Sequence, residues 1–519
     1  MFLMLKSWRM TKPRGDPEKR YISALTESAA SLFLTSLTDG LSFAIGSISD
    51  FHAVRVFCTY CAMAILFMFI FQVTFFNAVM SLCCRREIDG RHPILCCKTI
   101  VTRKSQEFPA IFAEHSMNAN SEVLARILFR VLNPVWCRVL VLVVFLIYLS
   151  LSIHFALALP LGLDLKLLAP DDSYVSRELL AQERLFADYG GFCFGVVNTT
   201  DLNMENRLVR RDLVQLYRDL GGGEFASCSE FWLEDFEREM HSSLNNFTFS
   251  DSLHTFLSRP KYLKYRNDVR FQLSGKIESI KMIFRIRKLG KQNDEPRATF
   301  MRQILEKSRF SGLIYDTSFL LVDQQLTTVY NVIIDVISAI LTMLAICVLM
   351  VPRPISALCI AFAILSVNIG VIGALSATKT RLDIISMITI VMSVGFSVDY
   401  VTHTTFHYVI QRKNRLENCL LVMTEPILQS ALSTAIGVSL LAFVDSYIVR
   451  TFVNTVFFVV GLGILHGLVF LPVLLDSVVP ESEYMIAYEC EESEEDQENQ
   501  YGNPKTFENL PYVLTCVKP

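Results

Sequence analysis

Eight long apolar stretches dominate the pattern of hydrophobic and polar positions along this chain. Each is long enough to cross the hydrocarbon core of a bilayer as a helix. They cover residues 28–48, 54–80, 138–160, 329–351, 355–377, 384–404, 427–444 and 452–475. Of the 519 residues, 52% are hydrophobic, and the mean hydropathy is +0.39. The pattern therefore predicts a polytopic α-helical membrane protein with about eight spans.

A more polar segment, residues 161–328, separates the third span from the fourth and is long enough to form a domain. Three parts of it have helical spacing, and three have the short or alternating apolar pattern of strands. The predicted helices cover 175–189, 204–220 and 295–307, and the predicted strands cover 192–197, 278–289 and 313–321. The alternation of strands and helices favours a ferredoxin-like α+β domain.

Basic residues assign the two sides of the membrane. Lysine and arginine cluster before the first span, between the second and third, and after the sixth. These segments share one side when eight spans alternate, so the positive-inside rule places them in the cytoplasm. The predicted organisation is a cytoplasmic segment (1–26), two helices (27–82), a cytoplasmic linker (83–137), one span (138–160), an extracellular domain (161–328), a five-helix bundle (329–480) and an acidic, disordered cytoplasmic tail (481–519).

The predicted extracellular domain contains the features expected of that compartment. Its two N-glycosylation sequons begin at Asn198 and Asn246. Its two cysteines are Cys193 and Cys228. In an oxidising compartment we expect them to form a disulfide, which would close a loop of roughly 35 residues and contribute about 4 kcal/mol. Two free thiols are the alternative.

Two segments of the chain resemble each other. Residues 26–82 resemble residues 424–477: a Thr-Glu pair begins each segment, and Val-Arg-x-Phe follows the loop at 54–57 and at 449–452. Spans one and two would thus duplicate spans seven and eight in the same orientation, as in many transporters. Chance similarity between apolar helices is the alternative reading.

One acidic residue, Asp399, lies inside the sixth span in the run Gly395-Phe-Ser-Val-Asp-Tyr. Insertion scales put a charge at mid-membrane depth at about 2.5–3.5 kcal/mol, so such residues often mark an ion pathway. Gly395 precedes Asp399 by one helical turn and His403 follows by one turn, so the three share a face. We interpret them as part of a proton relay. A buried acid held for packing, and a histidine at the membrane interface, are the alternatives.

Two other acids lie in predicted spans. Asp39, in the first span, has either a gating or substrate-binding role or a structural one through its Thr and Ser neighbours. Asp335, near the outer end of the fourth span, is expected to face water or a neighbouring helix. Because 26 residues precede the first repeated helix, we expect a truncated chain, a short isoform or an incomplete gene model. A second acid across the interface from Asp399 is then expected to be missing.

Several motifs resemble the patched-related branch of the resistance–nodulation–division superfamily, which also holds the Niemann–Pick sterol transporters. They are the Asp399 run with His403, Leu-Leu-Ala-Pro-Asp-Asp-Ser-Tyr at 167–174, Leu-Thr-Ser-Leu-Thr-Asp at 34–39 and Ser-Leu-Cys-Cys-Arg-Arg at 81–86. The resemblance implies twelve spans, two outer domains and a sterol-sensing domain of five helices. The first two spans here resemble the last two sterol-sensing helices.

The resemblance and the buried acid together favour a membrane permease that moves or senses a sterol or another lipid, coupled to protons. The alternative is a receptor or scaffold that binds a secreted ligand through its outer domain, in hedgehog-type signalling, trafficking or moulting. The sequence contains no nucleophile, metal or phosphate-binding signature, so we expect no enzyme activity and no cofactor. The basic clusters fit topology rather than nucleic acid. We expect the plasma membrane, or endosomal or vesicular membranes; the sequence leaves the oligomeric state open.

Overall fold

In the part of the chain that the structure describes, eight helices are long and apolar enough to cross a membrane, which confirms the predicted spans, and they form a bundle. The computed structural model describes residues 2–10, 17–88, 123–170, 172–240, 248–350, 353–411 and 414–479. The first-half helices are α2 (Pro17–Gly46) and α3 (His52–Phe71), the latter continued by η1 (Gln72–Phe76) and α4 (Asn77–Ile88). The others are α6 (Val135–Leu157), α12 (Thr317–Met350), α13 (Pro354–Ala377), α14 (Ile384–Ile410), α15 (Arg415–Ser439) with η5 (Leu440–Phe443), and α16 (Tyr447–Leu465) with η6 (His466–Phe470) and α17 (Leu471–Val478).

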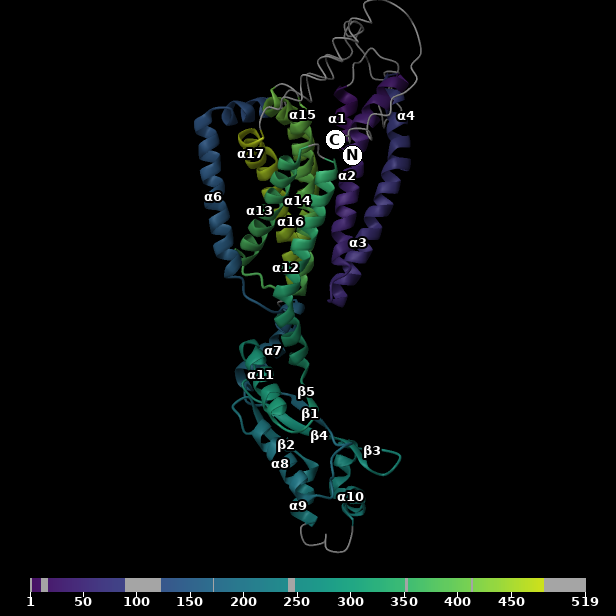
Figure 1. Ribbon diagram of the computed structural model, residues 1–519, viewed down its shortest axis with the longest axis vertical. Helices are drawn as coiled ribbons and strands as arrows, with labels where there is room; N and C mark the ends of the chain where they lie inside the picture. The colour runs from purple at the N-terminus through teal and green to yellow at the C-terminus, as the bar shows by residue number, and fades with distance from the viewer. Residues whose placement is uncertain are drawn as a thin grey trace, which may run out of the picture.

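The bundle and the polar domain lie at opposite ends of an elongated molecule (Figure 1). We call the side of the bundle that carries the domain the outer side. Helices α3 and α6 lie at opposite edges of the bundle in this view, with α14 between them. Helix α14 packs against α2, α12, α13, α15 and α16, and it contributes many side chains to the main apolar core.

The two repeated helix pairs share an irregularity. Both η1 and η6 are π-helical turns, and both interrupt the second helix of their pair. When Phe57 is aligned with Phe452, the two π-helical turns begin within one residue of each other. Such turns are rare and often occur at functional sites, so their matched positions support the duplication of spans one and two in spans seven and eight.

The outer domain is built on a mixed α+β plan. Its strands are β1 (Phe192–Asn198), β2 (Ala226–Glu230), β3 (Val269–Phe271), β4 (Ile277–Ile286) and β5 (Gly312–Tyr315). The sheet order is β2-β4-β1-β5, all pairings are antiparallel, and β3 pairs with β4. Helices α8 (Arg207–Gly221) and α11 (Lys291–Lys307) follow β1 and β4. Without β3, this is the strand order of a ferredoxin-like domain, as predicted.

Several parts of the domain differ from the prediction. Strand β2, strand β3, and helices α9 (Trp232–Met240) and α10 (Phe249–Ser258) were not predicted. The turn η4 (Pro260–Asn267) precedes β3, and α7 (Tyr174–Leu185) precedes β1. The strand predicted at 313–321 ends at Tyr315, because α12 begins at Thr317 and leaves the sheet towards the membrane. The fourth membrane helix therefore starts inside the domain.

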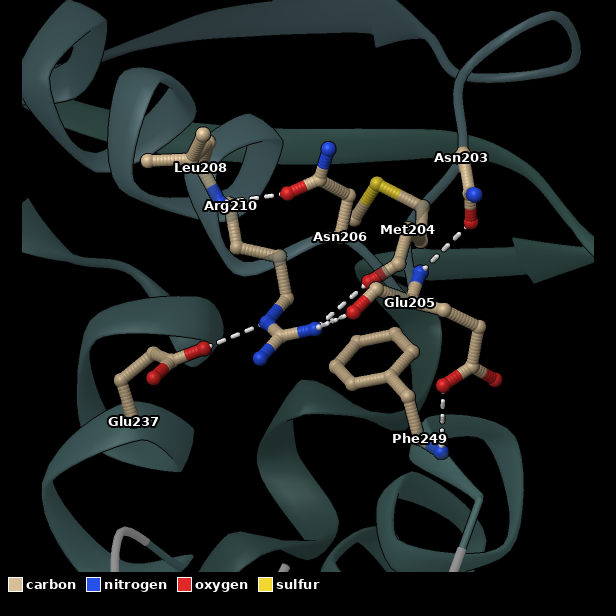
Figure 2. A network of polar contacts seen from close by, with 8 residues as sticks. All are labelled: Asn203, Met204, Glu205, Asn206, Leu208, Arg210, Glu237 and Phe249. Carbon is tan, nitrogen blue, oxygen red and sulfur yellow. Dashed lines mark hydrogen bonds and ion pairs between the residues drawn. The ribbon is translucent and has the colours of Figure 1, made fainter.

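A buried arginine joins the elements inserted in the domain (Figure 2). Arg210 on α8 is 3% exposed and forms an ion pair with Glu237 on α9. Its Nη1 donates to the carbonyl oxygens of Met204, at 2.7 Å, and Glu205, at 2.9 Å. Its guanidinium lies 4.7 Å from the ring centre of Phe249, at the start of α10. One cation thus connects α8, α9, α10 and the loop before α8.

The predicted disulfide is wrong in this structure, where Cys193 and Cys228 are both free thiols. Cys193 on β1 and Cys228 on β2 lie opposite Phe284 from its two sides, so strand β4 runs between them. Two strand spacings separate their Cα atoms by roughly 10 Å, and a disulfide needs less than about 7 Å. Burial raises the pKa of the Cys193 thiol to about 12, so it stays protonated and unreactive.

Of the two predicted glycosylation sequons, one lies within the described residues and one lies outside them. Asn198 is exposed at the end of β1, and its side-chain oxygen accepts a hydrogen bond from the Thr200 backbone at 2.9 Å. Its side-chain nitrogen is therefore on an accessible turn, and glycosylation there remains a prediction. Asn246 and the predicted acidic tail at 481–519 lie outside the described residues.

The predicted cytoplasmic segment 1–26 is partly built into the bundle. Helix α1 (Phe2–Met10) packs against α2 and α15, and Lys6 forms a buried ion pair of 2.7 Å with Glu425. Residues 17–26 belong to α2, which begins well before its apolar stretch. In the predicted linker 83–137, α4 extends to Ile88 and residues 123–132 are helical. A helix continues past its apolar stretch where polar side chains find partners, which hydropathy does not reveal.

Candidate functional site

The candidate site lies on α14, and its first determinant is the way α14 begins. Asp383 caps the helix: its Oδ1 accepts a hydrogen bond from the Ser386 backbone, and the Ser386 hydroxyl accepts from the Asp383 backbone, both at 2.8 Å. The second Asp383 oxygen accepts from the Tyr447 hydroxyl at 2.9 Å, at the start of α16. The cap therefore fixes where α14 starts and ties it to α16.

Hydrogen bonds on the opposite face set the rotation of α14. Asn368 on α13 accepts from the Ser393 hydroxyl at 2.6 Å and lies 3.5 Å from the Ser397 hydroxyl. All three residues are buried. The hydroxyls of Thr455 on α16 and Thr389 on α14 are also hydrogen-bonded, at 3.1 Å. With these residues turned towards α13 and α16, the face that carries Gly395, Asp399 and His403 turns towards α2.

Across that face lies a second acid, which the sequence analysis expected to be missing. A methyl group at Gly395 would lie 3.5 Å from Oδ1 of Asp39 on α2. Asp399 lies one turn further along α14, on the same face of the helix. The expectation that no second acid faces Asp399 was wrong, because it assumed that such an acid must come from a helix equivalent to the sixth span. The partner instead comes from a neighbouring helix of the first repeat.

Both carboxylates are incompletely satisfied. Among the buried side-chain atoms of the described residues, Oδ1 of Asp39 and Oδ1 of Asp399 have no hydrogen-bond partner. The Thr35 hydroxyl on α2 lies within reach of the Asp399 carboxylate. A buried, ionised carboxylate oxygen without a donor is costly, so the environment of both groups favours binding of a proton.

The His403 side chain contacts α2 through both of its ring nitrogens. Its Nδ1 lies 2.6 Å from the Ser31 hydroxyl, and its Nε2 lies 2.9 Å from the Thr35 hydroxyl. Thr35 is therefore placed between His403 and Asp399. The structure brings the predicted trio of Gly395, Asp399 and His403 to one interface, and the relay itself stays a prediction. Sequence reasoning missed Ser31, Thr35 and Asn368; hydroxyl and amide side chains inside apolar spans were the available signal.

A cavity of about 260 Å³ opens beside Asp399. Helices α1, α2, α14, α15 and α16 contribute its walls, which are largely apolar. Its lining residues are Phe2, Leu3, Leu32, Thr35, Phe396, Asp399, Tyr400, His403, Met423, Pro426, Ile427, Ser430, Thr434 and Val460. The acid and the histidine therefore border a space between the two repeats.

A second hollow lies on the outside of the bundle. This groove, of about 340 Å³, runs between α6, α13 and α16. Aromatic and small residues line it, namely Tyr148, Leu151, Ser152, Phe155, Gly370, Gly373, Ala374, Ala377, Phe457, Phe458, Gly461 and Leu462. Both the size and the apolar lining are typical of sites for small hydrophobic ligands.

Comparisons with known proteins agree with this architecture. Residues 1–100 match a family described as the sterol-sensing domain of SREBP cleavage-activation. The chain is 71% identical to patched-related protein 9 of Caenorhabditis elegans over 502 residues, which is 96% of this chain and 59% of that protein. It is 24% identical to the NPC intracellular cholesterol transporter 1 of Sus scrofa over 543 residues, which is 88% of this chain and 41% of that one.

A solved structure shares the fold. The hedgehog release protein Disp from the water bear Hypsibius dujardini aligns with a TM-score of 0.65 at 15% identity, covering 92% of this chain and 62% of that one. The chain thus shares the fold of that protein over most of its own length, and its first 100 residues match the sterol-sensing family. Its similarity to patched-related protein 9 extends over nearly its whole length. It spans about three-fifths of the length of the patched-related protein it matches.

Proposed function

We propose that this protein is a proton-coupled permease for a sterol or another membrane lipid, in the plasma membrane or in endosomal membranes. Asp399 and Asp39 bind and release the proton, and His403 with Thr35 and Ser31 leads it away from the outer side. The observation that carries the proposal is the pair of acids facing each other across the α2–α14 interface, each with an unpartnered oxygen.

The physical logic is electrostatic. Two carboxylates in a low-dielectric interior repel when both are ionised and attract through a hydrogen bond when one is protonated. Because Asp39 and Asp399 lie on different helices, proton binding draws α2 and α14 together and proton release separates them. Helix α2 belongs to the first repeat and α14 to the second half, so the proton state biases the movement of one half against the other.

Proton movement supplies enough energy for modest lipid transport. One charge that crosses 100 mV releases about 2.3 kcal/mol, so a few protons per cycle suffice for a lipid moved moderately uphill. The groove between α6, α13 and α16 is the entry site that we assign to the lipid, because it is apolar and lies on the bundle surface. The lipid names carried by the relatives, cholesterol above all, are the first substrates to try.

The test is transport by the complete protein in vesicles with an imposed pH gradient. Asp399→Asn keeps the shape of the side chain and removes its titration, so we expect loss of gradient-dependent sterol movement; Asp39→Asn should have the same effect. Asp445→Asn, an exposed acid in the loop before α16, is the matched control and should transport normally.

The competing hypothesis, a receptor or scaffold, predicts that function does not depend on pH or on Asp399. A receptor or scaffold would capture a secreted ligand through its outer domain equally well at any pH. If Asp399→Asn leaves lipid movement unchanged while ligand capture is retained, the permease proposal is wrong and the receptor hypothesis stands.

A further inference from the structure

The groove between α6, α13 and α16 has two polar side chains in an otherwise apolar lining. They are Tyr148 and Ser152, which lie one helical turn apart on α6. Tyrosine in membrane proteins is enriched at the two interfaces with water, whereas Tyr148 lies near the middle of α6. A hydroxyl at this depth is costly unless it has hydrogen-bond partners. The contacts of Tyr148 therefore indicate what the groove can recognise.

The Tyr148 hydroxyl is held against α13. It donates a hydrogen bond to the Ser366 carbonyl oxygen at 3.0 Å. A methyl group at Gly370 would lie 1.9 Å from the same hydroxyl oxygen, so the absence of a side chain at Gly370 provides the space for it. Gly370 itself lines the groove, which places the hydroxyl oxygen at the groove wall. A phenol oxygen that donates its one proton keeps the capacity to accept a hydrogen bond from a ligand.

Neighbouring side chains hold the Tyr148 ring in place. The ring stacks on Phe470 with centroids 6.0 Å apart, and it meets His466 edge to face at 5.6 Å. Nδ1 of His466 lies 2.8 Å from the Leu462 carbonyl oxygen, and Nε2 lies 3.0 Å from the Ser366 hydroxyl. A carbonyl oxygen only accepts, so Nδ1 carries the proton and Nε2 of the neutral ring accepts from Ser366. The acceptor that Tyr148 offers is therefore preorganised, which favours affinity.

The rest of the lining favours a flat, uncharged ligand. Helix α13 contributes only glycine and alanine to the groove, so this wall is smooth. None of the described residues that line the groove carries a charge, so the charge of a phospholipid headgroup would be unpaired there. A rigid ring system suits a smooth wall better than two flexible acyl chains, because it loses less conformational entropy on binding.

The groove has an outer end and an inner end. Helix α12 begins in the domain, so α13 runs back towards the outer side and ends there at Ala377. Phe155 lies close to the outer end of α6. Tyr148 and Gly370 lie about two helical turns further in on the same two helices. The Tyr148 hydroxyl is therefore at the inner end of the groove.

We propose that Tyr148 is the residue that selects the lipid: the groove binds a sterol whose free hydroxyl donates to Oη of Tyr148, with its ring system along α13. The inference rests on the proposed function, because it names the substrate class of the groove that we assign to the lipid. Steryl esters bind poorly because they lack the hydroxyl, and phospholipids bind poorly because they carry charge.

The experiment measures binding alone. The complete protein in lipid nanodiscs is labelled with a photoreactive sterol, and the competitor is either cholesterol or an analogue that lacks only the hydroxyl. Because one hydrogen bond separates the two competitors, we expect cholesterol to compete about tenfold better with the unsubstituted protein. In Tyr148→Phe, which keeps the ring and removes the acceptor, the two should compete equally. Tyr330→Phe, at an exposed tyrosine on α12, is the matched control and should keep the tenfold preference.

Three results would overturn the proposal: equal competition in the unsubstituted protein, a preference retained in Tyr148→Phe, or a preference lost in Tyr330→Phe. The first comparison needs no variant, so it decides the matter even if Tyr148→Phe folds poorly. Binding requires no proton gradient, so Asp399→Asn should show the same preference as the unsubstituted protein. A preference lost in Tyr148→Phe with normal transport in Asp399→Asn would support the sterol site and refute proton coupling. A preference retained in Tyr148→Phe with transport lost in Asp399→Asn would do the reverse.

Discussion

Single buried polar residues connect elements of this protein beside its apolar cores, and Arg210 is the clearest case. Its guanidinium meets one carboxylate, two carbonyl oxygens and the face of one ring. These partners come from segments inserted between β1 and β4, which have little sheet of their own. The sequence predicted α8 but gave no sign that one of its several arginines was buried, because burial depends on what packs over it.

Replacing Arg210 by alanine should destabilise the outer domain. The change leaves Glu237 and two carbonyl oxygens without their donor, and breaking a buried ion pair costs about 3–5 kcal/mol. We expect faster limited proteolysis of the domain in the detergent-solubilised protein and a lower melting temperature. Arg218→Ala, at an exposed arginine of the same helix α8 that forms an ion pair with Glu234 on α9, is the control and should change little. Similar proteolysis of the two variants would show that the Arg210 network is not a stabilising centre.

At the scale of helices and strands, the apolar pattern predicted the membrane spans well and the domain less well. Hydrophobic length is a strong signal, because a spanning helix must satisfy its backbone internally and present apolar side chains to lipid. Strand β2, Ala-Ser-Cys-Ser-Glu, has only the small residues Ala226 and Cys228 alternating with serine, which is a weak strand signal, and it pairs with β4. Close contact between helices was equally hidden: a methyl group at Gly373 on α13 would lie 2.6 Å from the Ser152 carbonyl oxygen on α6.

Substitution of Gly373 by alanine should therefore loosen the bundle. The clash is with backbone, which cannot rotate away, so α6 and α13 must separate at a cost of about 1–3 kcal/mol. We expect a lower melting temperature in detergent and less folded protein in the membrane. Gly437→Ala on α15 is the matched control, because a methyl group there meets nothing within 4 Å. Equal stability of both variants would mean that the α6–α13 contact can relax.

At the scale of the whole molecule, segments far apart in the sequence build the surfaces that we assign to the lipid. The groove between α6, α13 and α16 is lined by one helix that precedes the domain in the sequence, α6, and by two that follow it, α13 and α16. The acid pair likewise joins α2 to α14 across most of the chain. The groove and the acid pair are lined by different residues. A substitution that fills the groove should therefore weaken lipid binding and leave Asp39 and Asp399 unchanged.

The substitution Gly461→Leu should fill the groove between α6, α13 and α16. Gly461 lines the groove, and an added Cβ meets nothing within 4 Å, so a larger side chain fills space without a backbone clash. We expect a photoreactive sterol analogue to cross-link several-fold less to the variant. Gly437→Leu, on α15 and outside the set of residues that line the groove, should cross-link normally. The groove is not the lipid site if both variants label like the unsubstituted protein.

The sequence alone determined the number of spans, the place of the domain between them and the position of Asp399 within a span, because each depends on local composition and spacing. Tertiary structure decided what faces Asp399. Capping by Asp383 and hydrogen bonds to Asn368 fix the rotation of α14, and the notch at Gly395 admits Asp39. It also decided that Cys193 and Cys228 stay apart, because β4 takes its place between their strands. Such pairings arise between residues hundreds of positions or several elements apart, where no local pattern records them.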